Sequence, residues 1–282
     1  MSLAALPWYD FAELRQQTDA WWAGIARHLR ALGVARAPES LLRGRELAAH
    51  WRDPDLLLSQ SCGYDVLYDH ADALLPVATP CYLAEGCEGP RYRSYVVARA
   101  DRPWCTFEQL RGRRVAINEA TSHSGNNAMR PQAASLQQAG SFFGEVVVTG
   151  AHVESLRALH AGEVDAACID AVVLALLRRV RPQLVARLRR VAQTCVALAP
   201  PYVTSRRTPP ALLAKLRQAL HAAVRDPELR TAREALLLRD FVVFPADAYA
   251  ELEDFEEPAV EVGYLQLPAP SRSPLGRGEG RA

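Results

Sequence analysis

The 282-residue sequence has little of what would place it in a charged or fibrous class of protein. Only one of its 33 basic residues is a lysine, Lys215, and 32 acidic residues balance them to a formal net charge of +1. Such a balance creates no overall field that would draw the protein to nucleic acid or to an anionic membrane. Any anionic ligand must therefore be held by local geometry.

Long hydrophobic runs are also missing. No stretch approaches the roughly 20 apolar residues that cross a bilayer, so the protein is not expected to insert into a membrane. Residues 1–10 have neither a basic segment nor a long apolar core, and so they do not read as a secretory signal. The sequence as given predicts a cytoplasmic protein, or a periplasmic one if a leader has been removed.

Motifs for metals, nucleotides and covalent catalysis are absent as well. The six cysteines show no CxxC spacing and no Cys/His cluster at zinc spacing, which favours reduced thiols and no metal site. There is neither a P-loop lysine motif nor a GxGxxG motif, and no cofactor is expected. Cys62 or Cys87 beside a histidine would be a possible nucleophile–base pair, but no local signature supports it. The sequence does not favour an enzyme.

What the sequence does contain is an alternation of strand and helix patterns. Strands are predicted at 114–118, 145–149 and 166–169, and a helical pattern follows each of them. Further strands are expected at 2–6, 56–60, 74–78 and 94–98, and helices at 11–32, 210–225 and about 227–238. This order is typical of an α/β protein whose mostly parallel sheet is covered by helices. Residues 268–282, rich in Pro, Gly and Arg, predict a disordered tail.

The most specific feature is the run Thr121-Ser122-His123-Ser124-Gly125, between a predicted strand and the next helix. Ligands of open α/β sheets bind beyond the carboxyl ends of the strands, and the start of a helix favours an anion. Hydroxyl groups and a glycine at this place match the acceptor oxygens of a phosphoryl group. The alternative is that these residues merely cap the helix. Pro131 predicts that the helix either kinks or begins later, near Met129.

Two further positions follow later strands. His152, in the turn Gly150-Ala151-His152-Val153-Glu154-Ser155, is a candidate donor to the same anion, although a lone histidine in a turn is more often structural. Asp170 ends the strand at 166–169. Its carboxylate would accept a proton from a protonated phosphoryl oxygen or pair with an ammonium group, and the equal alternative is an N-cap of the next helix.

These motifs, taken in order, resemble those of the type II solute-binding proteins for phosphate, phosphite and phosphonate, the binding components of ABC importers. The resemblance rests on Thr-Ser-x-Ser-Gly at 121–125, Gly-x-His-x-x-Ser at 150–155 and Val-Asp-Ala-Ala-x-Ile-Asp at 164–170, and it spans roughly residues 2–267. It implies two α/β lobes joined by two hinge strands, with the ligand between them. Residues 1–98 with 202–267 would form the first lobe and residues 99–201 the second.

The resemblance also implies roles for particular residues. Those that would hold the phosphoryl oxygens are Thr121, Ser122, Ser124, Gly125 and His152, with Asp170 at the acidic position that selects among ligands. A tyrosine of the first lobe often completes such a site, and Tyr9, Tyr64 and Tyr82 are candidates. The implied partners are a small anion (phosphate, phosphite or phosphonate) and an ABC permease. A cytoplasmic enzyme or a ligand sensor on the same scaffold is the alternative.

Overall fold

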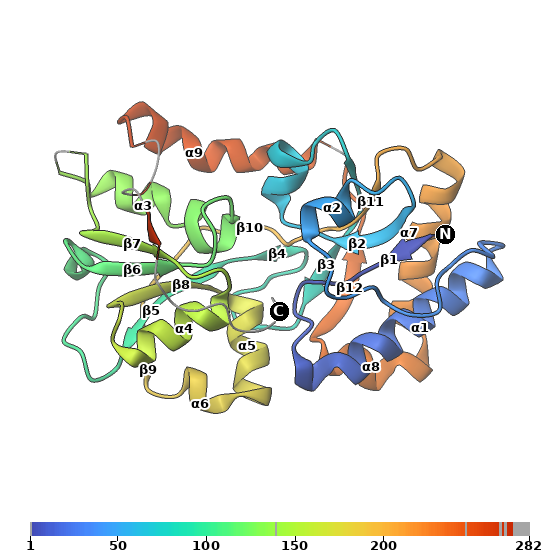
Figure 1. The fold of residues 1–282 in the computed structure, drawn as a ribbon, viewed down its shortest axis with the longest axis horizontal. Helices are drawn as coiled ribbons and strands as arrows, with labels where there is room; N and C mark the ends of the chain where they lie inside the picture. Colours follow the sequence, from blue (N-terminus) through green and yellow to red (C-terminus); the bar gives the residue numbers. More distant parts are fainter. Residues whose placement is uncertain (1, 139, 246, 265–266, 268–269, 273–282) are drawn as a thin grey trace. The chain divides into compact units, whose positions relative to one another are not determined.

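The computed structural model describes residues 2–138, 140–245, 247–264, 267 and 270–272, and the chain divides into two compact units (Figure 1). Unit 1 comprises the chain up to Arg91 and Leu198–Tyr249, and unit 2 comprises Tyr92–Ala197 and the chain from Ala250 onward. The chain passes between the units within two short strands that pair with each other, β4 (Arg91–Tyr92) and β10 (Ala197–Leu198).

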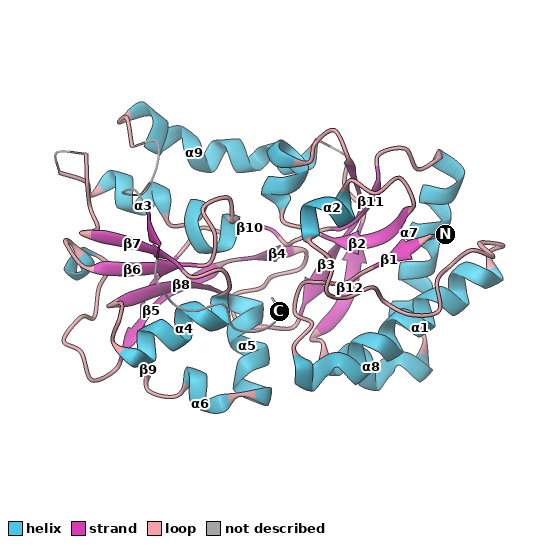
Figure 2. Cartoon of the chain, viewed as in Figure 1, coloured by secondary structure: helices cyan, strands magenta, loops and turns pink. Residues whose placement is uncertain are grey.

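Unit 1 is built on a mixed sheet in the order β1-β2-β11-β3-β12 (Figure 2). Its strands are β1 (Leu3–Ala4), β2 (Leu56–Gln60), β3 (Leu74–Tyr82), β11 (Tyr202–Ser205) and β12 (Leu238–Val242). β1 and β2 are parallel, whereas β11 and β12 run antiparallel to their neighbours. The prediction of a mostly parallel sheet is therefore too simple for this unit, because the strands that return from unit 2 run the other way.

Helices pack on this sheet, and the apolar residues that recur along their sequence are buried. The helix α1 (Arg15–Ala31) buries Trp21 and Trp22 almost completely, and Gly33, with a φ of 78°, follows its end. The helix α7 (Pro210–Arg225) starts with a proline, which is favoured at this position because it needs no hydrogen-bond donor there. The other described helical segments of unit 1 are η1 (Ala12–Leu14), α2 (Leu47–Trp51), η2 (Asp65–Asp69), η5 (Pro227–Leu229) and α8 (Arg230–Ala235), and η6 (Ala248–Ala250) crosses its boundary with unit 2. The predicted helix at 227–238 gives way at its end to strand β12.

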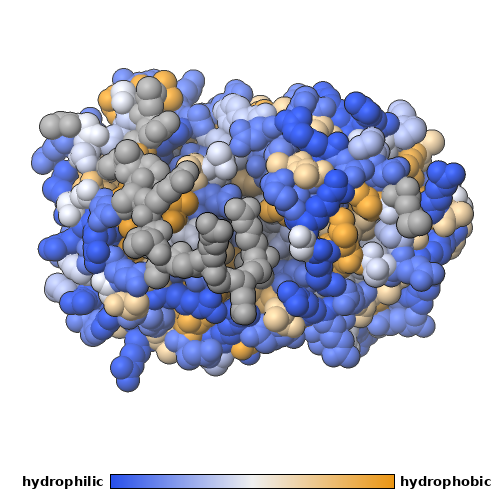
Figure 3. All heavy atoms as spheres, in the orientation of Figure 1, coloured by the Kyte–Doolittle hydropathy of each residue, from blue (hydrophilic) through white to orange (hydrophobic). Residues whose placement is uncertain are grey.

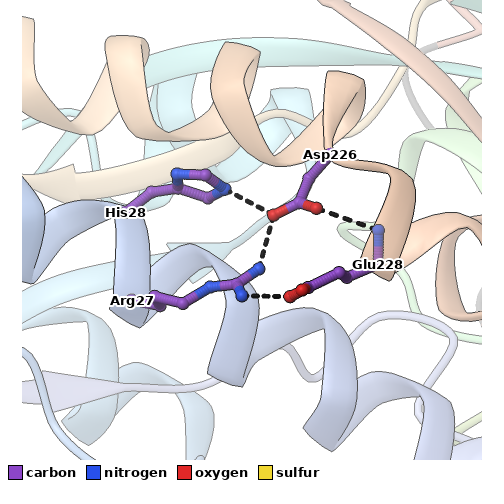
Figure 4. Close-up of polar contacts among 4 residues, drawn as sticks. All are labelled: Arg27, His28, Asp226 and Glu228. Atoms are coloured by element: carbon purple, nitrogen blue, oxygen red, sulfur yellow. Dashed lines mark hydrogen bonds and ion pairs between the residues drawn. The ribbon is translucent and has the colours of Figure 1, made fainter.

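An ionic cluster joins α1 to the turn between α7 and η5 (Figure 4). Asp226 accepts hydrogen bonds from His28 at 2.9 Å and from the backbone N–H of Glu228 at 2.9 Å, and it pairs with Arg27. Arg27 also pairs with Glu228, whose side chain is 72% exposed, whereas that of Asp226 is 11% exposed. Asp226 is thus both the cap of η5 and the central anion of the cluster.

The substitution Asp226→Ala should lower the free energy of unfolding by about 1–2 kcal/mol, since it removes a helix cap and the shared partner of Arg27 and His28. Urea denaturation followed by circular dichroism measures this loss. The matched control Glu228→Ala removes an exposed carboxylate and should change stability by no more than about 0.5 kcal/mol. Equal losses in the two variants would show that the cap and the contacts of Asp226 contribute no more to the free energy of unfolding than an exposed carboxylate does.

Unit 2 is built on a second sheet in the order β13-β7-β6-β8-β5-β9 (Figure 2). Its strands are β5 (Ser94–Arg99), β6 (Arg114–Ile117), β7 (Glu145–Val148), β8 (Ala166–Asp170), β9 (Leu188–Gln193) and β13 (Pro270–Arg272). β13, β7, β6 and β8 are parallel along the sheet, and β5 runs antiparallel to β8 and β9. The helical segments are η3 (Glu108–Leu110), η4 (His123–Asn127), α3 (Arg130–Ser135), α4 (His152–Ala161), α5 (Ala171–Val180), α6 (Pro182–Val185) and α9 (Glu251–Glu261).

The boundaries of the units differ from the predicted lobes at three places, the shortest of which is Leu198–Pro201, predicted in the second lobe but part of unit 1. Residues 94–98 were assigned to the first lobe, but β5 pairs with β8 and β9 in the sheet of unit 2. Residues 250–261, also assigned to the first lobe, form the start and body of α9, which packs on α3. A strand pattern does not reveal which sheet it joins, because partners are chosen by contacts that are distant in the sequence.

Most of the predicted tail, 268–269 and 273–282, lies outside the described residues. Pro270–Arg272 are described and form β13, which pairs in parallel with β7, so these three residues correct the prediction of a disordered segment. The edge of β7 leaves backbone groups that such a short segment can use for hydrogen bonds.

The surface seen in Figure 3 is largely hydrophilic, with apolar side chains in small groups. Across the described part of the chain, no helix combines the length and the apolar character that spanning a bilayer requires. All six cysteines are free, as the spacing predicts. Near the start of β9, Arg189 donates to the carbonyl oxygens of Ala100 and Arg102 at 3.2 Å each.

Candidate functional site

Two turns start side by side at the carboxyl ends of β6 and β7. The strands pair in parallel with Ile117 opposite Val148, so the chain leaves both at the same edge of the sheet. The first turn leads to the segment 121–125, and the second is 149–152. Thr149 N–H donates to the carbonyl of Ile117 at 3.0 Å, and Gly150 N–H donates to that of Asn118 at 2.8 Å. Backbone pairing therefore continues past the strands and holds the two turns together.

The segment Thr121–Gly125, named here the hydroxyl loop, enters a π-helical turn and not a regular α-helix. Ser122 is the residue before this turn, η4, and its Oγ accepts from Gly125 N–H at 3.3 Å. The α-helix α3 begins only at Arg130, after Met129, as the position of Pro131 predicts. The capping interpretation of Ser122 is thus confirmed, which leaves its role toward a ligand as a separate question.

A chain of polar side chains connects the two turns. Ser124 Oγ lies 2.9 Å from His152 Nε2, and Ser122 Oγ lies 3.3 Å from Ser124 Oγ. Thr121 is exposed, Ser122 and His152 are partly exposed, and Ser124 is 8% exposed. The structure therefore brings together Ser122, Ser124 and His152, which the sequence places in separate turns.

His152 opens helix α4 and is neutral at pH 7. The protein packed around the imidazole disfavours the charged form and lowers the pKa of His152 to about 4, against the opposing effect of a hydrogen bond to the backbone of Cys168. A neutral imidazole at this place either donates to Ser124 or accepts from it. It adds a polar atom to the site but no positive charge.

Thr149 and Ser155 hold the second turn rigid beneath His152. Their hydroxyl oxygens lie 2.7 Å apart, so one hydroxyl donates to the other, and both lie within hydrogen-bond distance of the carbonyl of Ala151, at 3.1 Å from Thr149 and 3.3 Å from Ser155. Ser155 is fully buried. Its hydroxyl therefore serves the fold of the turn and is not available as a donor to a ligand.

Gly125 is required because the hydroxyl loop lies directly on the end of β6. A Cβ at this position would lie 3.1 Å from the backbone nitrogen of Asn118 and 1.8 Å from its side-chain oxygen. The predicted reason for the glycine was a close approach to a ligand. The described contacts show a close approach to the protein's own backbone, and contact with a ligand stays a prediction.

Replacing Gly125 by alanine should push the hydroxyl loop away from Asn118 and lower the free energy of unfolding by about 1–3 kcal/mol, as overpacking does elsewhere. Thermal or urea unfolding measures the change. Thr121→Ala, an exposed substitution on the same loop, is the control and should have an effect near zero. A Gly125→Ala protein as stable as the control would contradict the close packing.

His123, inside the hydroxyl loop, points into the protein. It is 3% exposed, with the ring of Tyr92 centred 6.3 Å away and that of Phe255 centred 5.5 Å away. Burial lowers the pKa of His123 to about 4. His123 anchors the loop from within.

Because the unfolded state binds a proton to His123 near pH 6.5 and the folded state only near pH 4, acid should destabilise the fold between these values. The contribution of neutral His123 to the free energy of unfolding is complete above about pH 6.5 and is lost as the pH falls toward 4. At pH 5 this residue should account for about 2 kcal/mol of the loss. Urea unfolding at pH 7 and pH 5 should therefore show a smaller difference for His123→Gln than for the wild type. Equal differences would refute the assignment.

Asp170 lies at the end of β8 and is 2% exposed. Its Oδ1 accepts from the backbone N–H groups of Val172 at 2.6 Å and Val173 at 3.2 Å, so the N-cap alternative is confirmed. Its selection among ligands stays a prediction. Cys168, on the same strand, donates its thiol hydrogen to the carbonyl of Ser124 at 3.1 Å and so ties β8 to the hydroxyl loop.

The three predicted tyrosines all belong to unit 1. Tyr9 and Tyr82 meet edge to face with ring centres 5.3 Å apart, and Gln60 donates to the hydroxyl of Tyr82 at 2.9 Å. Tyr64, at the start of η2, lies against Tyr68 instead. Tyr9 also has a φ of 64°, a left-handed conformation that is strained for a bulky residue. Strain of this kind often marks a functional position.

Sequence reasoning missed several residues that shape the site. Asn118 was read only as the end of a strand, and Thr149 and Cys168 were read only as strand residues. Phe255 and Arg130 were not singled out because nothing in their local pattern relates α9 or α3 to the hydroxyl loop. Among the described residues, no group of three or more His, Cys, Asp or Glu side chains can hold a metal ion.

Comparison with known proteins gives the class of the chain. A family model described as "ABC transporter, phosphonate, periplasmic substrate-binding protein" matches residues 53–249, more than half of the sequence. The chain belongs to this family of phosphonate substrate-binding proteins. No match was found among curated proteins.

Solved structures share the fold at low sequence identity. The binding protein component of an ABC phosphonate transporter (PA3383) from Pseudomonas aeruginosa matches with a TM-score of 0.75 and 14% identity, over 93% of this chain and 88% of that one. PhnD1 from Prochlorococcus marinus, in complex with methylphosphonate, matches with a TM-score of 0.73 and 12% identity, over 93% of this chain and 98% of that one. XAC2383 from Xanthomonas citri, bound to chloride ion, matches with a TM-score of 0.69 and 16% identity, over 93% of this chain and 98% of that one. The α/β type II periplasmic-binding-protein fold is therefore shown.

Proposed function

We propose that this protein binds a small phosphorus oxyanion, namely phosphate, phosphite or an alkyl phosphonate, without transforming it. It would serve as the binding component of an ABC-type transporter or as a stand-alone homologue. The observation that carries the proposal is the 2.9 Å contact between Ser124 Oγ and His152 Nε2, which joins two turns at the same edge of the sheet. Membership of the phosphonate-binding family and the methylphosphonate complex of PhnD1 support the chemistry of the ligand.

The side chains of the hydroxyl loop suit an oxyanion better than a cation. Ser122, Ser124 and Thr121 carry hydroxyls that rotate to donate, and neutral His152 can donate through Nε2 when Ser124 turns to the ligand. Each hydrogen bond to a charged oxygen contributes about 1.5–3 kcal/mol. Two or three such bonds are enough for micromolar affinity (about 8 kcal/mol) when apolar contacts and exclusion of water add to them.

In this proposal a tyrosine completes the site, as the family resemblance implies. Tyr9 and Tyr82 are the preferred candidates, because their rings already pack together and the backbone of Tyr9 is strained. Tyr64 stays in the proposed set as a further candidate for this tyrosine, and Asp170 stays as the residue that selects among ligands. Gly125 contributes by letting the hydroxyl loop lie on Asn118.

Isothermal titration calorimetry with phosphate, phosphite, methylphosphonate, aminoethylphosphonate and sulfate tests the proposal. The wild type should bind at least one phosphorus oxyanion at micromolar concentration or below. Ser124→Ala combined with His152→Ala should weaken binding at least 100-fold, because the connected donors are lost.

His160→Ala is the matched control, since His160 lies on the same helix but hydrogen-bonds the carbonyl of Leu184. It should leave the affinity unchanged. If none of the five anions binds, the proposed function is wrong. Equal affinities of the double variant and the control would place the ligand elsewhere.

A further inference from the structure

The helix α9 packs against α3 in unit 2, beside the hydroxyl loop (Figure 1). Its eleven residues, Glu251–Glu261, are strongly acidic on the exposed side and bury Leu252 and Ala259. Two neighbouring residues of α9 contact the segment that contains the hydroxyl loop. These are Phe255 and Glu256, both partly buried.

Phe255 makes the first contact. Its ring meets the imidazole of His123 edge to face at a centre-to-centre distance of 5.5 Å, with an interplanar angle of 74°. His123 is the first residue of the π-helical turn η4 and the neighbour of both Ser122 and Ser124. A shift of this ring would therefore move Ser124, which contacts His152, and Ser122, which contacts Ser124.

Glu256 makes the second contact. Its Oε1 lies 3.2 Å from a guanidinium nitrogen of Arg130, whose side chain is only 9% exposed. The side chain of Glu256 is 23% exposed, so the pair is partly removed from water, and this burial raises the pKa of Glu256. Arg130 is the first residue of α3, directly after the turn that follows η4. The two contacts thus lie at the two ends of the turn that carries the hydroxyl loop.

A π-helical turn is rare and less regular than an α-helix, so its shape depends on what packs against it. We propose that α9 is the element that positions the hydroxyl loop. Phe255 and Glu256 are positioning residues, which hold His123 and Arg130 respectively. In this way they keep Ser124 within hydrogen-bond distance of His152. The expected effect on ligand affinity rests on the proposed function, whereas the expected effect on the contact between Ser124 and His152 does not.

The first test compares Glu256→Gln with Glu257→Gln, which removes the same charge from an exposed position of α9. Titration with methylphosphonate should show at least a 10-fold weaker affinity for Glu256→Gln and an unchanged affinity for Glu257→Gln. By reciprocity, methylphosphonate should slow amide hydrogen exchange in α9 of the wild type. Equal affinities of the two variants, with α9 exchange unchanged by ligand, would overturn the proposal.

The second test needs no ligand and so separates this proposal from the proposed function. Histidine side-chain NMR reports the hydrogen bond at His152 Nε2 directly. Its signal should shift or broaden in Phe255→Ala and Glu256→Gln and stay in place in Glu257→Gln. Phe255→Leu, which keeps an apolar side chain, should fold even if Phe255→Ala does not and should show a smaller change. A His152 signal that is the same in all these proteins would refute the positioning role.

Discussion

The parallel pairing of β6 with β7 is the constraint on which the candidate site depends. Because Ile117 and Val148 are register partners, the hydroxyl loop and the turn before α4 leave the sheet at the same edge. Thr149 and Gly150 extend the backbone pairing by one step beyond the strands. Ser124 and His152, 28 positions apart in the sequence, are then within 2.9 Å of each other. A change of register by one residue would reverse the direction of the side chains and separate them.

Burial governs the electrostatics of the two turns. It keeps His123 and His152 neutral, and among the described residues the contact between Ser124 and His152 includes no cation. Recognition of an anion by such a site relies on dipoles: hydroxyls, an imidazole and backbone amides. Dipolar sites of this kind select by geometry, because each donor must point to an acceptor, whereas a lysine or arginine attracts any anion nearby.

Several parts of this arrangement were predictable because their causes are local. The strand at 114–118, the break before Met129 caused by Pro131, and the N-cap alternative for Asp170 all follow from short-range sterics and capping. The same local reading failed for residues 94–98 and 250–261, whose unit is decided by partners far along the chain. It also did not reveal that Gly125 lies against Asn118, a residue whose sequence context gives no sign of this contact.

The sequence by itself determined the α/β class and the alternation of strands and helices along the chain. It also showed that hydroxyls and a histidine gather in two turns that follow strands. These features could be predicted because propensity, periodicity and capping act over a few residues. Only the tertiary structure decided that His123 is buried between Tyr92 and Phe255, that Ser124 meets His152, and that α9 belongs to unit 2. Each of these depends on packing between segments that are distant in the sequence, where the free energy of burying apolar surface outweighs any local preference.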